Sequence, residues 1–207
     1  MAIDARWTRV LVDDRRSLLY GPGTGRLYLL GPREAEDPRL RRLLGLAQST
    51  FAADLDDPAA AVAHDAASFR GTAPPRARAS LRAAYRLFDR TRSVLPFGLA
   101  ARLAAAAARR ERRRRPSDAN GGAGTVDAIA RAIHALERDV GYADCYPRAL
   151  LTAFLAVARG SACRIVIGVL APTRKMHAWC AVDGVVPYEP SPEHYLYRPL
   201  LVLSLDP

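Results

Sequence analysis

Two side chains in the last third of the chain, Cys145 and His177, could together perform nucleophilic catalysis. Cys145 begins an apolar segment that is predicted to be a helix, with Pro147 in its first turn, where proline is tolerated. Unpaired amides and the positive end of the dipole at a helix N-terminus favour a thiolate over a thiol. His177 begins a predicted strand, and its imidazole could take the thiol proton. The pair therefore has the residue types of a cysteine nucleophile and its base.

The remaining cysteines and histidines have structural interpretations. A cysteine in an apolar segment is more often inert core than catalytic, and both Cys163 and Cys180 lie inside strand patterns. The three cysteines form an odd set without Cys-x-x-Cys or zinc-site spacing, which argues against a disulfide framework and a structural metal. We expect no metal and no cofactor. The other histidines are interpreted as structural or exposed: His64, His134 and His194.

A third group should orient the imidazole, and two carboxylates compete for this role, Asp183 and Glu189. Asp183 belongs to an Asp-Gly turn, where its side chain more simply stabilises the turn. A strict two-residue turn would pair His177 with Pro190. A three-residue loop with Gly184 as a bulge would pair His177 with Glu189, and we favour this register.

The elements around these residues read as an α+β domain. The helix that starts at Cys145 is predicted to stop at Gly160, followed by a buried strand, CRIVIGVL, and by a hairpin of HAWCAV and VVPY around the Asp-Gly turn. Upstream, a helical face is predicted from Leu81, Tyr85 and Leu87, and a second helix from Leu99 to about Arg115. A further helix capped by Thr125 precedes the Cys145 segment.

The N-terminal part has a different pattern. Short apolar runs separated by turn formers predict a three-stranded meander from Trp7 to Leu30. Helices are predicted from Asp37 to Leu46 and over about 57–69. The Pro- and Gly-containing segment 71–78 reads as a linker, so the predicted domains are residues 1–75 and residues 76–207.

Charge and hydropathy narrow the classes of function. The net charge of +10 would suit nucleic acid, but much of it comes from the arginine-rich run 109–115, which reads as a solvated helix end. We therefore expect no nucleic-acid partner. The sequence has no apolar run long enough for a membrane span and no secretion signal, so we expect no membrane association and a cytoplasmic protein.

The motifs of the last third resemble a known family when taken together. They are DCYPRALLTAFLAVARGSACRIVIGVL, then MHAWCAVDGVV, and a glutamate twelve residues after the histidine. This combination over residues 125–203 resembles the B protein of lasso peptide biosynthesis, the transglutaminase-like leader peptidase of the microcin-processing type. The resemblance implies a papain-like domain in which a helix bearing the cysteine packs on an antiparallel sheet.

The resemblance also implies roles for individual residues. Cys145 would be the nucleophile and His177 the base, and Glu189 stands where the family has an aspartate. Arg148 and Trp179 would support the site. Such a peptidase would remove the leader from a ribosomally made lasso precursor, before an asparagine-synthetase-like cyclase closes the macrolactam.

The family also occurs fused to a small, winged-helix-like leader-recognition domain, which residues 1–75, with their N-terminal meander, resemble more loosely. Such a unit would bind the leader as an added strand at a sheet edge, and we expect this edge at residues Leu27, Tyr28, Leu29 and Leu30. Two rival functions remain at this stage. One is a transglutaminase-like acyltransferase, in which an amine resolves the thioester, and the other is a non-catalytic protein that binds the leader or nucleic acid.

Overall fold

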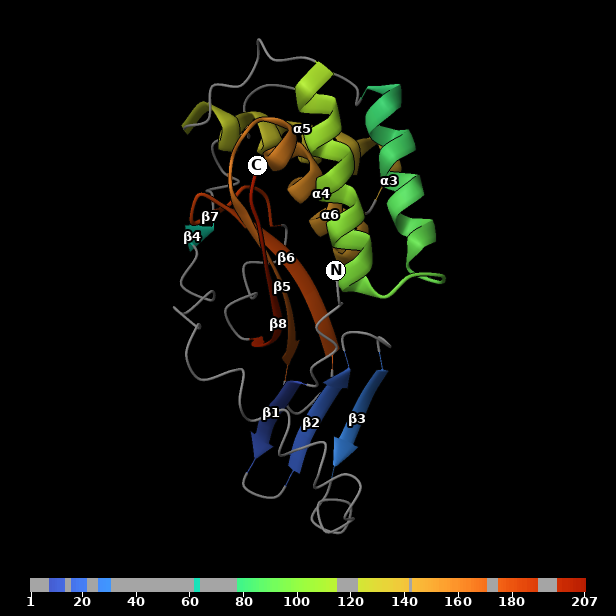
Figure 1. The fold of residues 1–207 in the computed structure, drawn as a ribbon, viewed down its shortest axis with the longest axis vertical. Coiled ribbons are helices and arrows are strands. Elements are labelled where there is room, and N and C mark those ends of the chain that lie inside the picture. Colours follow the sequence, from blue (N-terminus) through green and yellow to red (C-terminus); the bar gives the residue numbers. More distant parts are fainter. Residues whose placement is uncertain are drawn as a thin grey trace.

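The structure, a computed structural model, describes residues 8–13, 16–21, 26–30, 62–63, 78–114, 123–141, 143–170, 175–189 and 197–207. These residues form two sheets and four helices (Figure 1). The N-terminal sheet has the order β1-β2-β3, and the C-terminal sheet has the order β4-β7-β6-β5-β8. The C-terminal part is an α+β unit, with helices packed on four antiparallel strands, and a short parallel β4 at the edge.

The helices lie on one face of the C-terminal sheet, and α6 (Cys145–Ala158) is the one that packs against β6 and β5. Nine of its residues are buried, because its apolar side chains face the other helices as well as the sheet. Gly160 follows α6 at φ +82°, the left-handed conformation that ends many helices. The sequence prediction for this helix is confirmed at both ends. Its amino end, which carries Cys145, is thereby fixed by the core.

Three other helices complete this layer: α3 (Ala79–Thr91), α4 (Phe97–Arg114) and α5 (Ala123–Val140). The predicted apolar face of α3 was wrong at Leu87, which is 60% exposed, since the buried position is Phe88. The helical spacing of three from Tyr85 places Phe88, not Leu87, on the inner face. The α5 helix begins at Ala123, two residues before the predicted cap at Thr125, whose side chain is buried.

The strands that follow α6 are β5 (Cys163–Leu170), β6 (Lys175–Val182), β7 (Val185–Val186) and β8 (Arg198–Leu205). The β5 strand is central, pairing with β6 on one side and β8 on the other. Side chains that alternate along β5 fill the core under the helices and a second cluster on the other face. Sequence analysis did not predict β8, although its run PLLVLSL is typical of a strand.

The predicted register of the β6–β7 hairpin was wrong. Val182 pairs with Val185 across a two-residue turn, Asp183-Gly184, in which both residues have positive φ (51° and 82°). Consecutive positive φ values are typical of the tight turns that match strand twist, so no bulge is needed at Gly184. The β7 strand ends after Val186, shorter than the predicted VVPY strand.

The predicted meander is confirmed as β1 (Thr8–Asp13), β2 (Arg16–Gly21) and β3 (Arg26–Leu30), paired antiparallel. As expected, β3 is an outer strand of that sheet. The helix predicted over 57–69 was wrong at Val62–Ala63, which forms β4 and pairs in parallel with β7. The predicted helix from Asp37 to Leu46 and the domain boundary at 75/76 lie outside the described residues.

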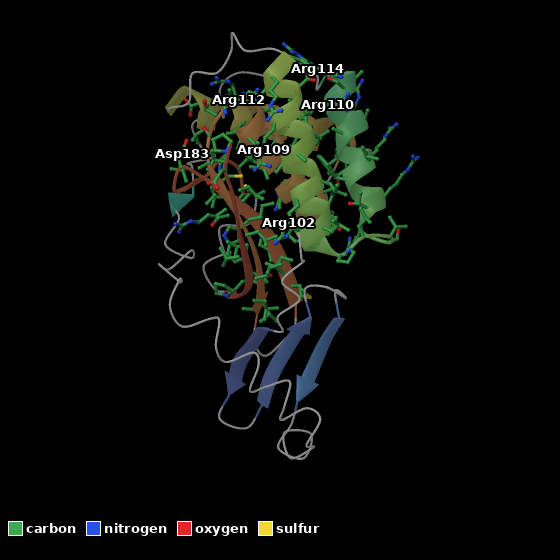
Figure 2. All side chains as sticks on the ribbon, viewed as in Figure 1. Arg102, Arg109, Arg110, Arg112, Arg114 and Asp183 are labelled. Carbon is green, nitrogen blue, oxygen red and sulfur yellow. The ribbon has the colours of Figure 1, made fainter. Side chains whose placement is uncertain are left out.

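The arginine-rich end of α4 is exposed at Arg110, Arg113 and Arg114, as the sequence suggested, whereas Arg109 and Arg112 are half-buried. Arg109 donates two hydrogen bonds to the carbonyl of Asp206, at 2.7 and 3.2 Å, and so holds the chain end against α4. The guanidinium of Arg112 lies over Gly160, where an added Cβ would be 3.0 Å away. Figure 2 shows these arginines along the helix, together with Arg102, Arg110 and Arg114. None of the described helices is long and apolar enough to span a membrane.

Candidate active site

The amino end of α6 carries a half-buried thiol beside a capping carboxylate. Asp144 is the N-cap residue, and its Oδ1 accepts a hydrogen bond from the amide of Tyr146 at 3.2 Å. Its Oδ2 accepts one from Arg92 at 2.6 Å. Burial raises the pKa of Asp144, but hydrogen bonds from the Tyr146 amide, Arg92 and Cys145 outweigh it and lower the pKa below its ordinary value. Cys145 is thus next to an ionised carboxylate whose charge Arg92 balances.

The imidazole of His177 lies between the Cys145 thiol and the Glu189 carboxylate. Its Nε2 is 3.1 Å from Oε2 of Glu189, which leaves Nδ1 for the thiol. The other carboxylate oxygen, Oε1, accepts a hydrogen bond from Arg148 at 2.9 Å. The side chains of Glu189 and Arg148 are only 1% and 5% exposed, so the carboxylate is held from both sides in the interior. The structure therefore brings Cys145, His177 and Glu189 together, with Arg148 behind them.

Glu189 reaches His177 by a different route from the one the sequence suggested. With the two-residue turn, the chain of β7 pairs with β6 only at Val185, far from His177 along the strand. After Val186 the chain leaves the ladder at Pro187, which has no amide hydrogen to donate to a sheet. Residues 187–189 then run without strand pairing and bring Glu189 to the imidazole. The predicted contact is present, although the predicted register is absent.

The other faces of the imidazole are packed by aromatic rings. Trp179, two residues along β6 and 1% exposed, stacks on His177 with centroids 5.9 Å apart and an interplanar angle of 20°. The ring of Tyr197 lies 5.1 Å from His177 at 42°. Both aromatic residues lie over Gly168, which pairs with His177 across β5 and β6. The absence of a side chain at Gly168 leaves the space that the Trp179 ring and the Cβ of Tyr197 occupy.

We predict that Gly168→Ala destabilises the protein and lowers the reactivity of Cys145. A Cβ at this position would be 2.8 Å from Trp179 Cη2 and from the Cβ of Tyr197, so the residues that pack on His177 must shift. Overpacking of this kind costs about 1–3 kcal/mol. Urea unfolding and alkylation of Cys145 measure the two effects. Gly124→Ala is the control, because nothing lies within 4 Å of its new Cβ; equal behaviour of the two variants would contradict the prediction.

The environment of His177 favours its protonated form. Burial lowers the pKa of His177, but hydrogen bonds with Cys145 and Glu189 and their negative charges outweigh it and raise the pKa from 6.5 to about 9. At neutral pH the imidazole is therefore an imidazolium that can pair with a thiolate and donate a proton. This is the electrostatic state in which a cysteine nucleophile and its acid are both ready to react.

The reactive pair opens into a cavity of about 450 Å³. Cys145 and His177 line one side of it, and the α3–α4 connection, residues 92–96, lines another. The rim is apolar at Val94, which is 73% exposed, and at Met176, which is 43% exposed. A cavity of this size can hold a few side chains of an extended peptide next to the thiol.

A comparison with protein families gives the same interpretation. The model of the transglutaminase-like superfamily matches residues 91–202, more than half of the chain, and covers Cys145, His177 and Glu189. The chain belongs to the transglutaminase-like superfamily. This superfamily is largely made of cysteine-dependent enzymes, which is consistent with a peptidase-like or acyltransferase activity. No curated protein and no solved structure matches the chain.

The other sequence-predicted residues of the transglutaminase-like domain lie away from the reactive pair. Cys163 and Cys180 are buried free thiols, and burial, with a hydrogen bond to Cys163, raises the pKa of Cys180 well above its ordinary value. Asp183 is exposed in its turn, at the end of the β6–β7 hairpin (Figure 2). Among the described residues, no group of three or more His, Cys, Asp or Glu side chains could hold a metal.

Sequence reasoning missed several residues of this site: Arg92, Glu137, Asp144 and Tyr197. Asp144 had a readable signal, because an aspartate immediately before an apolar helix with proline in its first turn is a typical cap. Glu137 had none, since a glutamate within a helical pattern usually faces solvent. Arg92 and Tyr197 lie outside regular elements, where periodicity gives no information.

Proposed function

We propose that the protein is a cysteine peptidase that removes the leader from a ribosomally made lasso peptide precursor. The observation that carries the proposal is the buried Glu189 carboxylate that holds His177 against Cys145 at the amino end of α6. Support for the substrate comes from the motifs of the last third, which resemble those of the lasso leader peptidases. The superfamily match supports the cysteine-dependent chemistry.

In the proposed mechanism, the Cys145 thiolate attacks the carbonyl carbon of the bond between leader and core. A bond forms between Sγ and this carbon, and the carbon–nitrogen bond breaks as the imidazolium of His177 gives its proton to the leaving amine. The neutral imidazole then takes a proton from water, whose oxygen attacks the thioester. The sulfur–carbon bond breaks, and the leader leaves with a carboxylate, while the core peptide has a free amine.

Few backbone amides of α6 could donate a hydrogen bond to the oxyanion that forms in both steps. The amide of Tyr146 is occupied by Asp144, and Pro147 has no amide hydrogen. Among the described residues of the first turn, the amide of Cys145 itself is the one best placed to donate to an oxyanion. A single donor is weaker than two, so the imidazolium of His177 contributes positive charge beside the oxyanion.

Residues 1–75 would recognise the leader in this proposal. The β3 strand is an outer strand of the described N-terminal sheet, so its free edge could pair with an extended peptide. The segment added there would be the leader, and its scissile end would enter the cavity beside Cys145. An asparagine-synthetase-like cyclase would then use the free amine of the core. Nucleic acid and membrane have no role in this mechanism.

We expect wild-type protein to cleave a lasso precursor and Cys145→Ala to lose cleavage by several orders of magnitude, since the nucleophile is lost. Mass spectrometry of a precursor encoded beside this gene, incubated with each protein, measures this. Cys163→Ala is the matched control, because it removes a buried thiol outside the site. Cleavage that persists in Cys145→Ala would contradict the proposal. A product carrying an added amine in place of water would identify an acyltransferase instead.

A further inference from the structure

The buried side of the site continues beyond Glu189 into a chain of charged and polar groups. The guanidinium of Arg148 lies between two carboxylates, with Nη2 2.9 Å from Glu189 and Nη1 3.4 Å from Glu137. Glu137 comes from α5, and its side chain is only 12% exposed. On its far side, Tyr188 donates a hydrogen bond to Glu137, and burial with this bond raises the pKa of Tyr188. The proposed mechanism assigns Glu137 no role.

The charges of this chain can be counted as a cluster of four groups, Glu137, Arg148, Glu189 and His177. With a neutral imidazole, the two carboxylates and one guanidinium leave a net charge of −1 in the interior. With an imidazolium, the cluster is neutral. A buried net charge is costly, whereas a paired cluster is tolerated. Moving the thiol proton to His177 therefore transfers the negative charge from the interior to the half-buried thiolate of Cys145, at the positive end of α6.

We propose that Glu137 is a positioning residue of the site, because its carboxylate makes the buried cluster neutral only when His177 carries its proton. This inference rests on the proposed catalytic role of His177. Without Glu137, Arg148 alone would neutralise Glu189, and a proton on His177 would leave the cluster with a net charge of +1 that only the thiolate of Cys145 could balance. Arg148 would also be free to turn wholly toward Glu189 and compete with His177 for that carboxylate.

The other charged groups around the cluster do not provide this balance. On the open side, Asp144 and Arg92 form an ion pair at 2.6 Å that contributes no net charge next to Cys145. Behind Glu137, the hydroxyl of Tyr188 is 3.2 Å from Nδ1 of His134, whose ring packs on that of Tyr188 at 5.4 Å. Besides Cys145 and Glu189, Tyr197 is a titratable group of the described residues that contacts His177.

The test is a direct titration of His177 in the full chain. The protein has four histidines, and histidine-selective ¹⁵N labelling with a His177→Gln spectrum identifies the signal of interest. We expect the His177 pKa to be near 9 in the wild type and to fall by about one unit in Glu137→Gln, the size expected for the loss of one nearby charge. Glu137→Met, which removes the charge with another shape, should give the same fall if the glutamine variant folds poorly.

The matched control is Asp139→Asn. Asp139 lies two residues further along α5 and loses the same charge, but its partner is the exposed Arg82 at 2.9 Å. We expect no shift of the His177 pKa in this variant. Equal pKa values in the Glu137 and Asp139 variants would overturn the proposal for Glu137 without touching the peptidase. Cys145 alkylation no faster than that of Cys163 in the wild type would count against the peptidase instead.

Discussion

Replacing Glu189 with glutamine should lower the reactivity of Cys145 at neutral pH by about ten- to a hundredfold. The carboxylate is the negative partner of the imidazolium, at 3.1 Å and with its side chain 1% exposed. Glutamine has nearly the same shape but no charge, so the His177 pKa should fall from about 9 toward 6.5. Each unit of this fall lowers the ratio of imidazolium to neutral imidazole about tenfold at a given pH. The thiolate thereby loses its counterion.

Glu189→Gln should also lose activity at a lower alkaline pH than the wild type does. In the wild type, His177 keeps its proton up to about pH 9, so it can protonate the leaving amine throughout the neutral range. With a lowered pKa, the alkaline limb of the pH–rate profile moves to lower pH. Iodoacetamide labelling followed by peptide mass spectrometry, at several pH values, measures Cys145 separately from Cys163 and Cys180.

Asp183→Asn is the control for this prediction, since the sequence alone left Asp183 as an alternative partner of His177. Asp183 is exposed in the hairpin turn, and its amide contacts Ala162 rather than the site. We expect this variant to react like the wild type. If Asp183→Asn slowed alkylation as much as Glu189→Gln, the assignment of Glu189 as the orienting group would be wrong.

The sequence was sufficient to propose Cys145 and His177 because local signals defined the element that carries each of them. Cys145 stands where an apolar period of 3.6 begins, and His177 stands at the start of a β-branched and aromatic run, so both elements could be predicted locally. The contact between Cys145 at the start of α6 and His177 near the start of β6 depends on long-range packing of α6 on β6. The motifs, rather than periodicity, predicted this contact, and the structure brings the two side chains together.

The parts that could not be predicted depend on the tertiary structure. A bulge at Gly184 would pair Glu189 with His177 across the hairpin, but the structure has a two-residue turn there. In the structure β7 ends before Pro187, and residues 187–189 follow an irregular path to His177. No local rule of sequence specifies this path. Likewise, Glu137 reads as a solvent-facing position of α5, and only the packing of α5 against α6 gives it Arg148 as a partner. Burial of a charge can be recognised only when its counterion is known.

Arg148→Ala should have the largest effect on stability of any single change at the site, a loss of about 3–5 kcal/mol in the free energy of unfolding. Arg148 is 5% exposed and is the cation between two buried carboxylates. Removing it leaves Glu189 and Glu137 facing one another across a cavity, without a positive charge between them. Urea unfolding followed by circular dichroism measures the loss, and the activity should fall with it because Glu189 no longer has a fixed position.

The control for this loss is Arg82→Ala, which breaks an ion pair of the same length, 2.9 Å, at the surface. Its side chain is 37% exposed, so water replaces the lost partner and the cost should stay below about 1 kcal/mol. The double variant Arg148→Met with Glu189→Gln tests the cause, since it removes one charge of each sign from the interior. It should be more stable than Arg148→Met alone, because the two variants pack the same stem and the double variant keeps only one of the two carboxylates, Glu137. Equal stability of these two variants would mean that the charge of Glu189 does not account for the loss.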